Sequence, residues 1–98
     1  MYFVIHKSLI RPGKTLEELK LWMRQHDATL AKWGAVEADL YRPLFGESNL
    51  FFMRYKLKSI DQWHKAFQSP EGQKILESLG EVLDLSSTTI YVMEEIPY

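Results

Sequence analysis

Cysteine is absent from this sequence of 98 residues, and its absence excludes several kinds of protein. A chain without cysteine has no disulfide framework, no zinc knuckle and no cysteine nucleophile. Its three histidines, His6, His26 and His64, form no HxH or HxxxH pair, the close spacing that neighbouring metal ligands use. We therefore expect no metal site.

The sequence also lacks an excess of charge of either sign, because 12 lysines and arginines balance 13 aspartates and glutamates to a net charge of −1. Nucleic-acid binding depends on clustered basic side chains, so no nucleic-acid partner is expected. No apolar run approaches the ~20 residues of a membrane span. The N-terminus also lacks the basic start and long apolar stretch of a signal peptide. The sequence predicts a cytoplasmic protein with no membrane association.

Glycine is sparse, with 5 residues, and none lies in a phosphate-binding loop, a dinucleotide fingerprint or a Gly-x-Ser-x-Gly motif. Nucleotide-dependent chemistry therefore has no support, and we expect no cofactor. What the chain does have is 46% hydrophobic residues, enough for the core of a single domain over residues 1–98. A domain of this size is only modestly stable alone, which leaves room for a stabilising oligomer.

Hydrophobic periodicity divides the chain into alternating strands and helices. Capping-box spacings at residues 15–18 and 59–62 predict the starts of two helices. Gly34 is placed to end the first helix, and Ser69-Pro70 predicts a kink and restart within the second. The expected elements are a strand over 2–10, a helix over 16–33, strands over 35–43 and 49–57, a kinked helix over 60–83 and a strand over 87–96.

The resulting order is β-α-β-β-α-β. With right-handed crossovers, this order predicts an α+β, ferredoxin-like fold. Its four strands form an antiparallel sheet in the order 4-1-3-2, with both helices on one face.

Strand residues alternate between the two faces of a sheet, so one set in each strand faces the helices. We expect that set to comprise Phe3, Ile5, Leu9, Val36, Ala38, Leu40, Phe51, Met53, Tyr55, Leu57, Ile90, Val92 and Ile96. The open face then carries Tyr2, Val4, His6, Leu50, Phe52, Tyr91 and Met93. Because an exposed apolar face of this kind usually marks an interface, we expect a symmetric homodimer that packs the two sheets together.

The segments QHDATLAKWGA (25–35) and SIDQWHKAFQSPEGQKILESL (59–79), with this element order, resemble the dimeric α+β barrel superfamily. This superfamily includes antibiotic-biosynthesis monooxygenases, heme-degrading monooxygenases, muconolactone isomerases and stress-response proteins. The resemblance implies a homodimer with a ligand cleft between each sheet and its own helices. Several of its groups have a histidine where His26 lies. One group pairs that histidine with an Asp-Pro acid, and this chain has Ser69 at the comparable place.

His26 is the candidate catalytic residue, since an imidazole on the helix face of Trp22 and Leu30 can act as a general base near neutral pH. The alternative is a half-buried histidine that interacts with the helix C-terminus. An apolar pocket for a planar ligand would be walled by Trp22, Tyr55, Trp63, Met53 and Phe51, although these residues equally suit a filled core.

A second candidate cluster combines His6, Arg54, Tyr41 and Asp39 at the dimer face, as a polar pocket or as interface ion pairs. Three functions follow. The first is a homodimeric enzyme that acts on an apolar or aromatic small molecule by cofactor-independent monooxygenation or isomerisation. The second is a non-catalytic dimer that binds a small molecule or a protein, and the third, by resemblance alone, is a heme-binding or heme-degrading protein.

Overall fold

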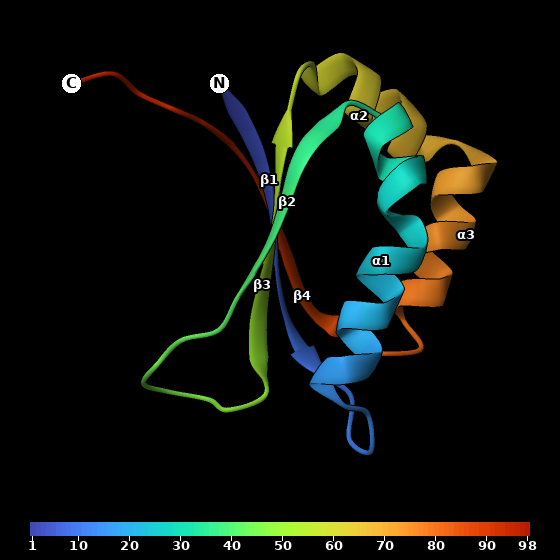
Figure 1. Cartoon of the computed structure of the whole chain (residues 1–98), viewed down its shortest axis with the longest axis vertical. Helices are drawn as coiled ribbons and strands as arrows, with labels where there is room; N and C mark the ends of the chain where they lie inside the picture. Colours follow the sequence, from blue (N-terminus) through green and yellow to red (C-terminus); the bar gives the residue numbers. More distant parts are fainter.

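A computed structural model describes all residues, 1–98, as one four-stranded sheet with every helix on the same face (Figure 1). The strands lie in the order β2-β3-β1-β4, and all neighbours are antiparallel. This arrangement confirms the predicted ferredoxin-like fold and strand order. The elements are β1 (Tyr2–Ile10), α1 (Leu16–Lys32), β2 (Ala35–Tyr41), β3 (Leu50–Leu57), α2 (Ile60–Gln68), α3 (Pro70–Leu79) and β4 (Leu83–Glu94). None of the helices has the length and apolar character to cross a membrane.

The predicted helix ends are confirmed by their caps. Thr15 Oγ1 accepts a hydrogen bond from the Glu18 amide at 3.3 Å, and Ser59 Oγ accepts one from the Gln62 amide at 3.2 Å. Gly34 ends α1 with φ 101°, a conformation that residues with a Cβ adopt rarely. The side chain of Gln62 does not complete a reciprocal capping box. Its Nε2 donates instead to the Lys32 carbonyl at 2.9 Å, and this hydrogen bond ties α2 to the end of α1.

The last helix and the last strand differ from their predicted bounds. The helix ends at Leu79, and β4 begins at Leu83, although the sequence pattern placed both Val82 and Leu83 in the helix. Leu83 is buried as a strand residue because it pairs with Ile10 of β1. Ile96 was expected in the strand facing the helices, but it follows the end of β4 and is exposed.

The side chains of β1 face the opposite way from the prediction. Val4, His6, Ser8 and Ile10 are buried under the helices, whereas Phe3, Ile5 and Leu9 lie on the open face with Lys7. The register explains this, since Val4 pairs with Tyr55 and His6 with Met53, and paired residues point to the same side. In the paired parts of the other three strands, the side chains predicted to face the helices do so. Leu40 of β2 lies opposite Met53, and Val92 of β4 lies opposite Val4.

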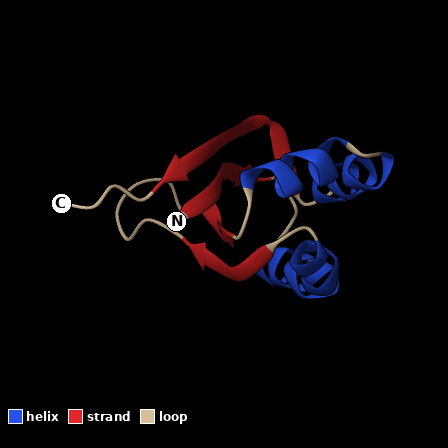
Figure 2. Ribbon diagram, turned by 90° about the horizontal axis from the view of Figure 1, so that it is seen from above, coloured by secondary structure: helices blue, strands red, loops and turns tan.

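Figure 2 shows the helices and the sheet as two layers. The buried hydrophobic side chains of both layers form one core cluster. Its most buried members include Leu19 of α1, Leu79 of α3 and Met53 of β3. The β2–β3 loop and the residues after β4 extend away from the helices, toward the open side of the sheet, in both views (Figures 1 and 2).

Candidate functional site

His6 is the buried polar side chain that the fold leaves without a partner. It lies in the middle of β1, is 4% exposed, and neither ring nitrogen has a hydrogen-bond partner within the protein. Its ring makes T-shaped contacts with two aromatic rings, and the ring centroids are 6.0 Å from Tyr55 and 6.4 Å from Phe67. Buried polar groups are nearly always paired, and an unpaired one costs free energy, so His6 is a candidate binding group.

An apolar cavity of about 20 Å³, partly open to the surface, touches one side of His6, and we call it the internal cavity because it lies between the helices and the sheet. Most of its lining comes from large hydrophobic side chains of α1, β3, α2 and α3. The lining residues are His6, Trp22, Leu30, Trp33, Met53, Tyr55, Trp63, Phe67, Gly72, Ile75, Leu76 and Leu79. The volume is about that of a single water molecule, so any larger ligand at this point needs side chains to move.

A wider cleft of about 340 Å³ reaches His6 from the side of β4. It runs between α2 and the edge strand, and it shares Trp63 and Phe67 with the internal cavity. Its lining residues are Val4, His6, Trp63, His64, Phe67, Gln68, Gln73, Ile90 and Val92. A volume of this size suits a small organic molecule, and His6 lies where the cleft meets the apolar cavity.

Burial sets the protonation of the two titratable groups at the centre of this site. It lowers the pKa of His6 to about 4, because a charged imidazole would lose its hydration without gaining a partner. Burial also raises the pKa of Tyr55, and the nearby charge of Asp27 adds to this effect. At neutral pH both groups are uncharged, so His6 presents one hydrogen-bond donor and one acceptor.

His26 lies outside this cavity and cleft. Its Nδ1 is 2.7 Å from the Trp22 carbonyl oxygen one turn earlier in α1, and its ring stacks on Trp22 at 4.4 Å. The groove beside it is lined by polar residues such as Lys14, Glu18 and Glu81. The structure therefore separates His26 from Tyr55 and Trp63.

Four of the five predicted pocket residues do come together. Trp22, Met53, Tyr55 and Trp63 all line the internal cavity, and Tyr55 packs on Trp63 with centroids 5.4 Å apart. Phe51 is buried in the core but lines neither this cavity nor the cleft.

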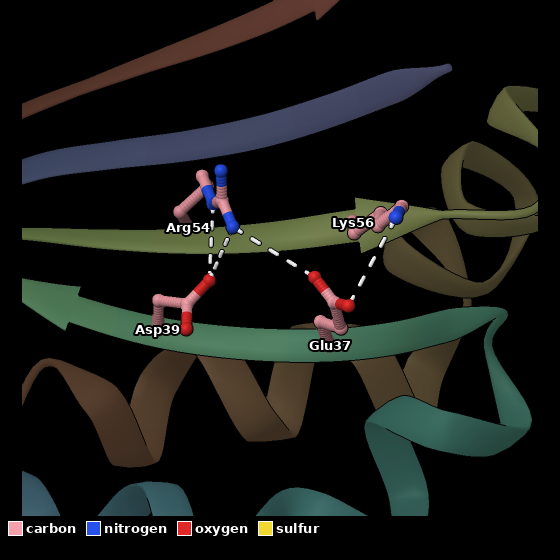
Figure 3. A network of polar contacts seen from close by, with 4 residues as sticks. All are labelled: Glu37, Asp39, Arg54 and Lys56. Carbon is pink, nitrogen blue, oxygen red and sulfur yellow. Dashed lines mark hydrogen bonds and ion pairs between the residues drawn. The ribbon is translucent and has the colours of Figure 1, made fainter.

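Of the second candidate cluster, the structure brings Arg54, Tyr41 and Asp39 together on the open face of the sheet, without His6. Arg54 Nε donates to Asp39 Oδ2 at 3.1 Å, and Arg54 also lies 3.8 Å from Glu37, which approaches Lys56 at 3.9 Å (Figure 3). The hydrogen bond to Asp39 raises the pKa of the Arg54 guanidinium.

Aromatic rings complete this open-face cluster. The guanidinium lies 4.9 Å from the Phe3 ring and 5.9 Å from that of Tyr41. The prediction that His6 joins this cluster is wrong, because the β1 register turns His6 to the other face of the sheet. No three His, Cys, Asp or Glu side chains lie close enough together to hold a metal ion.

Lys7 is the residue from which the orientation of β1 could have been predicted correctly. Phe3, Ile5, Lys7 and Leu9 share one side of β1, and a lysine is seldom fully buried. The opposite set, Val4, His6, Ser8 and Ile10, contains no residue that carries an obligatory charge at neutral pH.

Solved structures resemble the whole chain. A conserved protein from Methanosarcina mazei Go1 is 22% identical over 97% of this chain and 92% of that one, with a TM-score of 0.73. SnoaB, a cofactor-independent oxygenase from Streptomyces nogalater, is 12% identical over 99% and 94%, with a TM-score of 0.77. An antibiotic biosynthesis monooxygenase is 12% identical over 99% and 100%, with a TM-score of 0.71.

No protein-family model and no curated protein matches the chain. Identities this low establish the fold alone. These structures share with this chain the ferredoxin-like fold that the sequence predicted.

Proposed function

We propose that this protein binds a small apolar or aromatic molecule in the cleft between α2 and β4, and transforms it by cofactor-independent monooxygenation or isomerisation. One observation carries the proposal: an unpartnered, buried His6 lies where this cleft meets an aromatic cavity. The names of two proteins with the same fold, an antibiotic biosynthesis monooxygenase and a cofactor-independent oxygenase, support the reaction class.

His6 replaces His26 as the residue to which we assign the chemistry. The uncharged imidazole is a weak base because burial lowers the pKa of His6 to about 4, so it can accept a proton from an acidic group of the substrate and return it. In an isomerisation the same proton goes back to a different atom. In a monooxygenation, molecular oxygen would be the co-reactant and the substrate itself the reductant: a ring CH2 group becomes C=O, one oxygen atom enters the substrate, and the two hydrogens that the substrate loses leave with the other oxygen atom as water. Since His26 faces a polar surface groove, it has no access to a ligand in the cleft.

Filling the cleft tests the binding proposal. Val92 lines the cleft from β4, so Val92→Trp should occlude it. We expect naphthalene, detected by ligand-observed NMR, to bind the wild type. It should bind Val92→Trp at least about tenfold more weakly, because the indole ring occupies apolar surface that the ligand would otherwise cover. The control is Lys65→Trp at an exposed position of α2. Failure of naphthalene to bind the wild type, or equal binding to Val92→Trp, would contradict the proposal.

A non-catalytic binding protein is the alternative, and turnover distinguishes the two. With a dihydroxynaphthalene as substrate, a monooxygenase consumes oxygen faster than buffer does, and His6→Phe should abolish the excess. An isomerase is followed instead by exchange of substrate protons with deuterium from the solvent. A ligand that binds without either reaction would assign the protein to the binding class.

We also propose that the protein is a homodimer joined through the open face of the sheet. That face carries Phe3, Ile5, Leu9, Leu50, Phe52, Tyr91 and Met93, a corrected version of the set expected from the sequence. Its charged side chains include Lys7 and the group Arg54, Lys56, Glu37 and Asp39, whose members form ion pairs with one another within the chain, so most of the charge on this face is already paired before a second copy covers it (Figure 3). Sedimentation at micromolar concentration should give twice the chain mass of 11.6 kDa, and a monomer would contradict the proposal.

A further inference from the structure

We infer that the ligand of this cleft carries a neutral hydrogen-bonding group at its buried end, bound by His6, and a second polar group at the cleft mouth. The inference rests on the proposed binding function and defines its ligand class. It excludes ligands that would bring a carboxylate, phosphate or amine to His6.

The buried end of the cleft offers no counter-ion to a charged ligand group. The lining of the cleft contains no lysine, arginine, aspartate or glutamate. The internal cavity beyond His6 has none either. A carboxylate or ammonium group that is carried to the His6 end gives up its hydration and gains no counter-ion, which is costly. A hydroxyl, carbonyl or amide loses much less there.

At the buried end, His6 is the polar side chain of the lining, and because its nitrogens are covered in the folded chain, a ligand reaches them when neighbouring side chains move. Both of its nitrogens are without a partner, while the neighbouring cleft residues Val4, Phe67 and Ile90 are apolar. Trp63 also lines the cleft, and its ring packs against Tyr55. A ligand oxygen that reaches His6 therefore satisfies a donor or an acceptor that the folded chain leaves bare.

At the mouth, the polar residues are uncharged amides and an imidazole. His64 and Gln68 of α2 and Gln73 of α3 line this end, and all three are exposed. The amide nitrogen of Gln73 donates to the Phe67 carbonyl at 3.1 Å, which fixes the side chain and leaves its oxygen as an acceptor. Ile90 and Val92 of β4 form the apolar side of the cleft. The lining therefore combines apolar side chains with uncharged hydrogen-bonding groups of Gln68 and Gln73 at the mouth.

Naphthalene derivatives test the class because they share one skeleton. The probes are naphthalene, 2-naphthol, 2,6-dihydroxynaphthalene, 2-naphthoate and 2-naphthylmethylamine, titrated at pH 7.0 with ligand-observed NMR. We expect 2-naphthol to bind about tenfold more tightly than naphthalene, as for one hydrogen bond that would otherwise stay unmade. The diol should bind more tightly still, and the naphthoate and the amine should bind more weakly than 2-naphthol.

Variants assign the buried contact. In His6→Phe the advantage of 2-naphthol over naphthalene should disappear, and His6→Gln, which keeps a donor and an acceptor, should restore part of it. His26→Phe is the matched control and should change neither affinity. In case neither variant at position 6 folds, ¹⁵N chemical shifts of the His6 ring in the wild type should move with 2-naphthol and stay unchanged with naphthalene.

The outcomes separate the inference from the proposed function. If naphthalene binds and naphthoate or the amine binds as tightly as 2-naphthol, the ligand class is wrong while the binding site stands. An equal affinity for naphthalene and 2-naphthol, or a His6 shift that does not respond to the hydroxyl, would also overturn the inference. If naphthalene itself does not bind, the proposed function fails first.

Discussion

His6 shows how one side chain can be both a cost to the fold and a requirement of its site. The protein buries a polar ring among aromatic neighbours and gives it no hydrogen bond. An unsatisfied buried polar group typically costs about 1–3 kcal/mol. A leucine at this position would avoid that cost, so the histidine is best explained by a partner that arrives from outside the chain.

The stability of the fold should depend on pH through His6. Burial lowers the pKa of His6 from 6.5 to about 4, so below pH 6.5 the unfolded chain binds a proton that the folded chain does not. The free energy of unfolding should therefore fall as the pH falls from about 6.5 to about 4, by up to about 3 kcal/mol. Urea unfolding at pH 7, 6, 5 and 4.5 measures this loss.

The control for the pH effect is His6→Leu. Carboxylates also begin to titrate at the lower end of this range, and both proteins share them, so the difference between the two curves isolates His6. The variant should lose less stability than the wild type between pH 6.5 and 4.5. Parallel curves would show that His6 is not a buried, neutral group in the folded state.

At the scale of elements, α2 and α3 are joined by a residue that caps both. Ser69 Oγ accepts a hydrogen bond from the Gly72 amide at 3.1 Å and donates one to the Ala66 carbonyl. Pro70 then occupies the first turn of α3, where its missing amide proton is not needed. The kink that the sequence predicted at this point sets the angle at which Phe67 and Gln73 approach the cleft.

Gly72 should be the residue at this junction that tolerates substitution least. A Cβ at position 72 would collide with the carbonyl oxygens of Ala66 and Phe67, which are backbone atoms and cannot move aside freely. Gly72→Ala should lower the free energy of unfolding by about 1–3 kcal/mol through overpacking. Chemical unfolding measures it, with Lys74→Ala on the exposed side of α3 as the control. Unchanged stability in Gly72→Ala would contradict this packing of the two helices.

At the scale of the whole molecule, two segments extend from the same side of the sheet. The β2–β3 loop carries Leu44 and Phe45, each 92% exposed, and the residues after β4 carry Ile96, 73% exposed. Both segments lie on the side away from the helices (Figure 1). In a dimer joined at the open faces, these apolar side chains are placed to pack against the partner subunit.

Removing the apolar tips should weaken the proposed dimer. Each large side chain that becomes buried contributes about 1.5–3 kcal/mol. The double change Leu44→Ser and Phe45→Ser should therefore raise the dimer dissociation constant by at least about tenfold. Sedimentation velocity over a dilution series measures it, and Leu21→Ser, a half-exposed leucine of α1, is the control. An equal effect of Leu21→Ser would indicate general destabilisation instead.

The sequence predicted most of the local structure because local chemistry determines it. Thr15, Ser59 and Ser69 cap helices through hydrogen bonds to residues three positions away. Gly34 ends α1 through its own conformational freedom, and the order of elements then leaves few ways to form a sheet. The aromatic residues that gather in the cavity, including Trp22, Tyr55 and Trp63, could also be predicted from periodicity.

Tertiary structure decided the orientation of β1 and with it the site. Each side of this strand mixes apolar and polar side chains, so alternation does not fix the buried side, and Lys7 is the one local signal for it. Pairing of His6 with Met53 of β3 and Ile90 of β4 turns the histidine toward the helices. That pairing joins residues about 50 and 85 positions apart, and register over such distances depends on how the whole core packs. The packing of α1 on the sheet likewise decides the place of His26: its ring stacks on Trp22 one turn earlier and lines a surface groove, not the cavity.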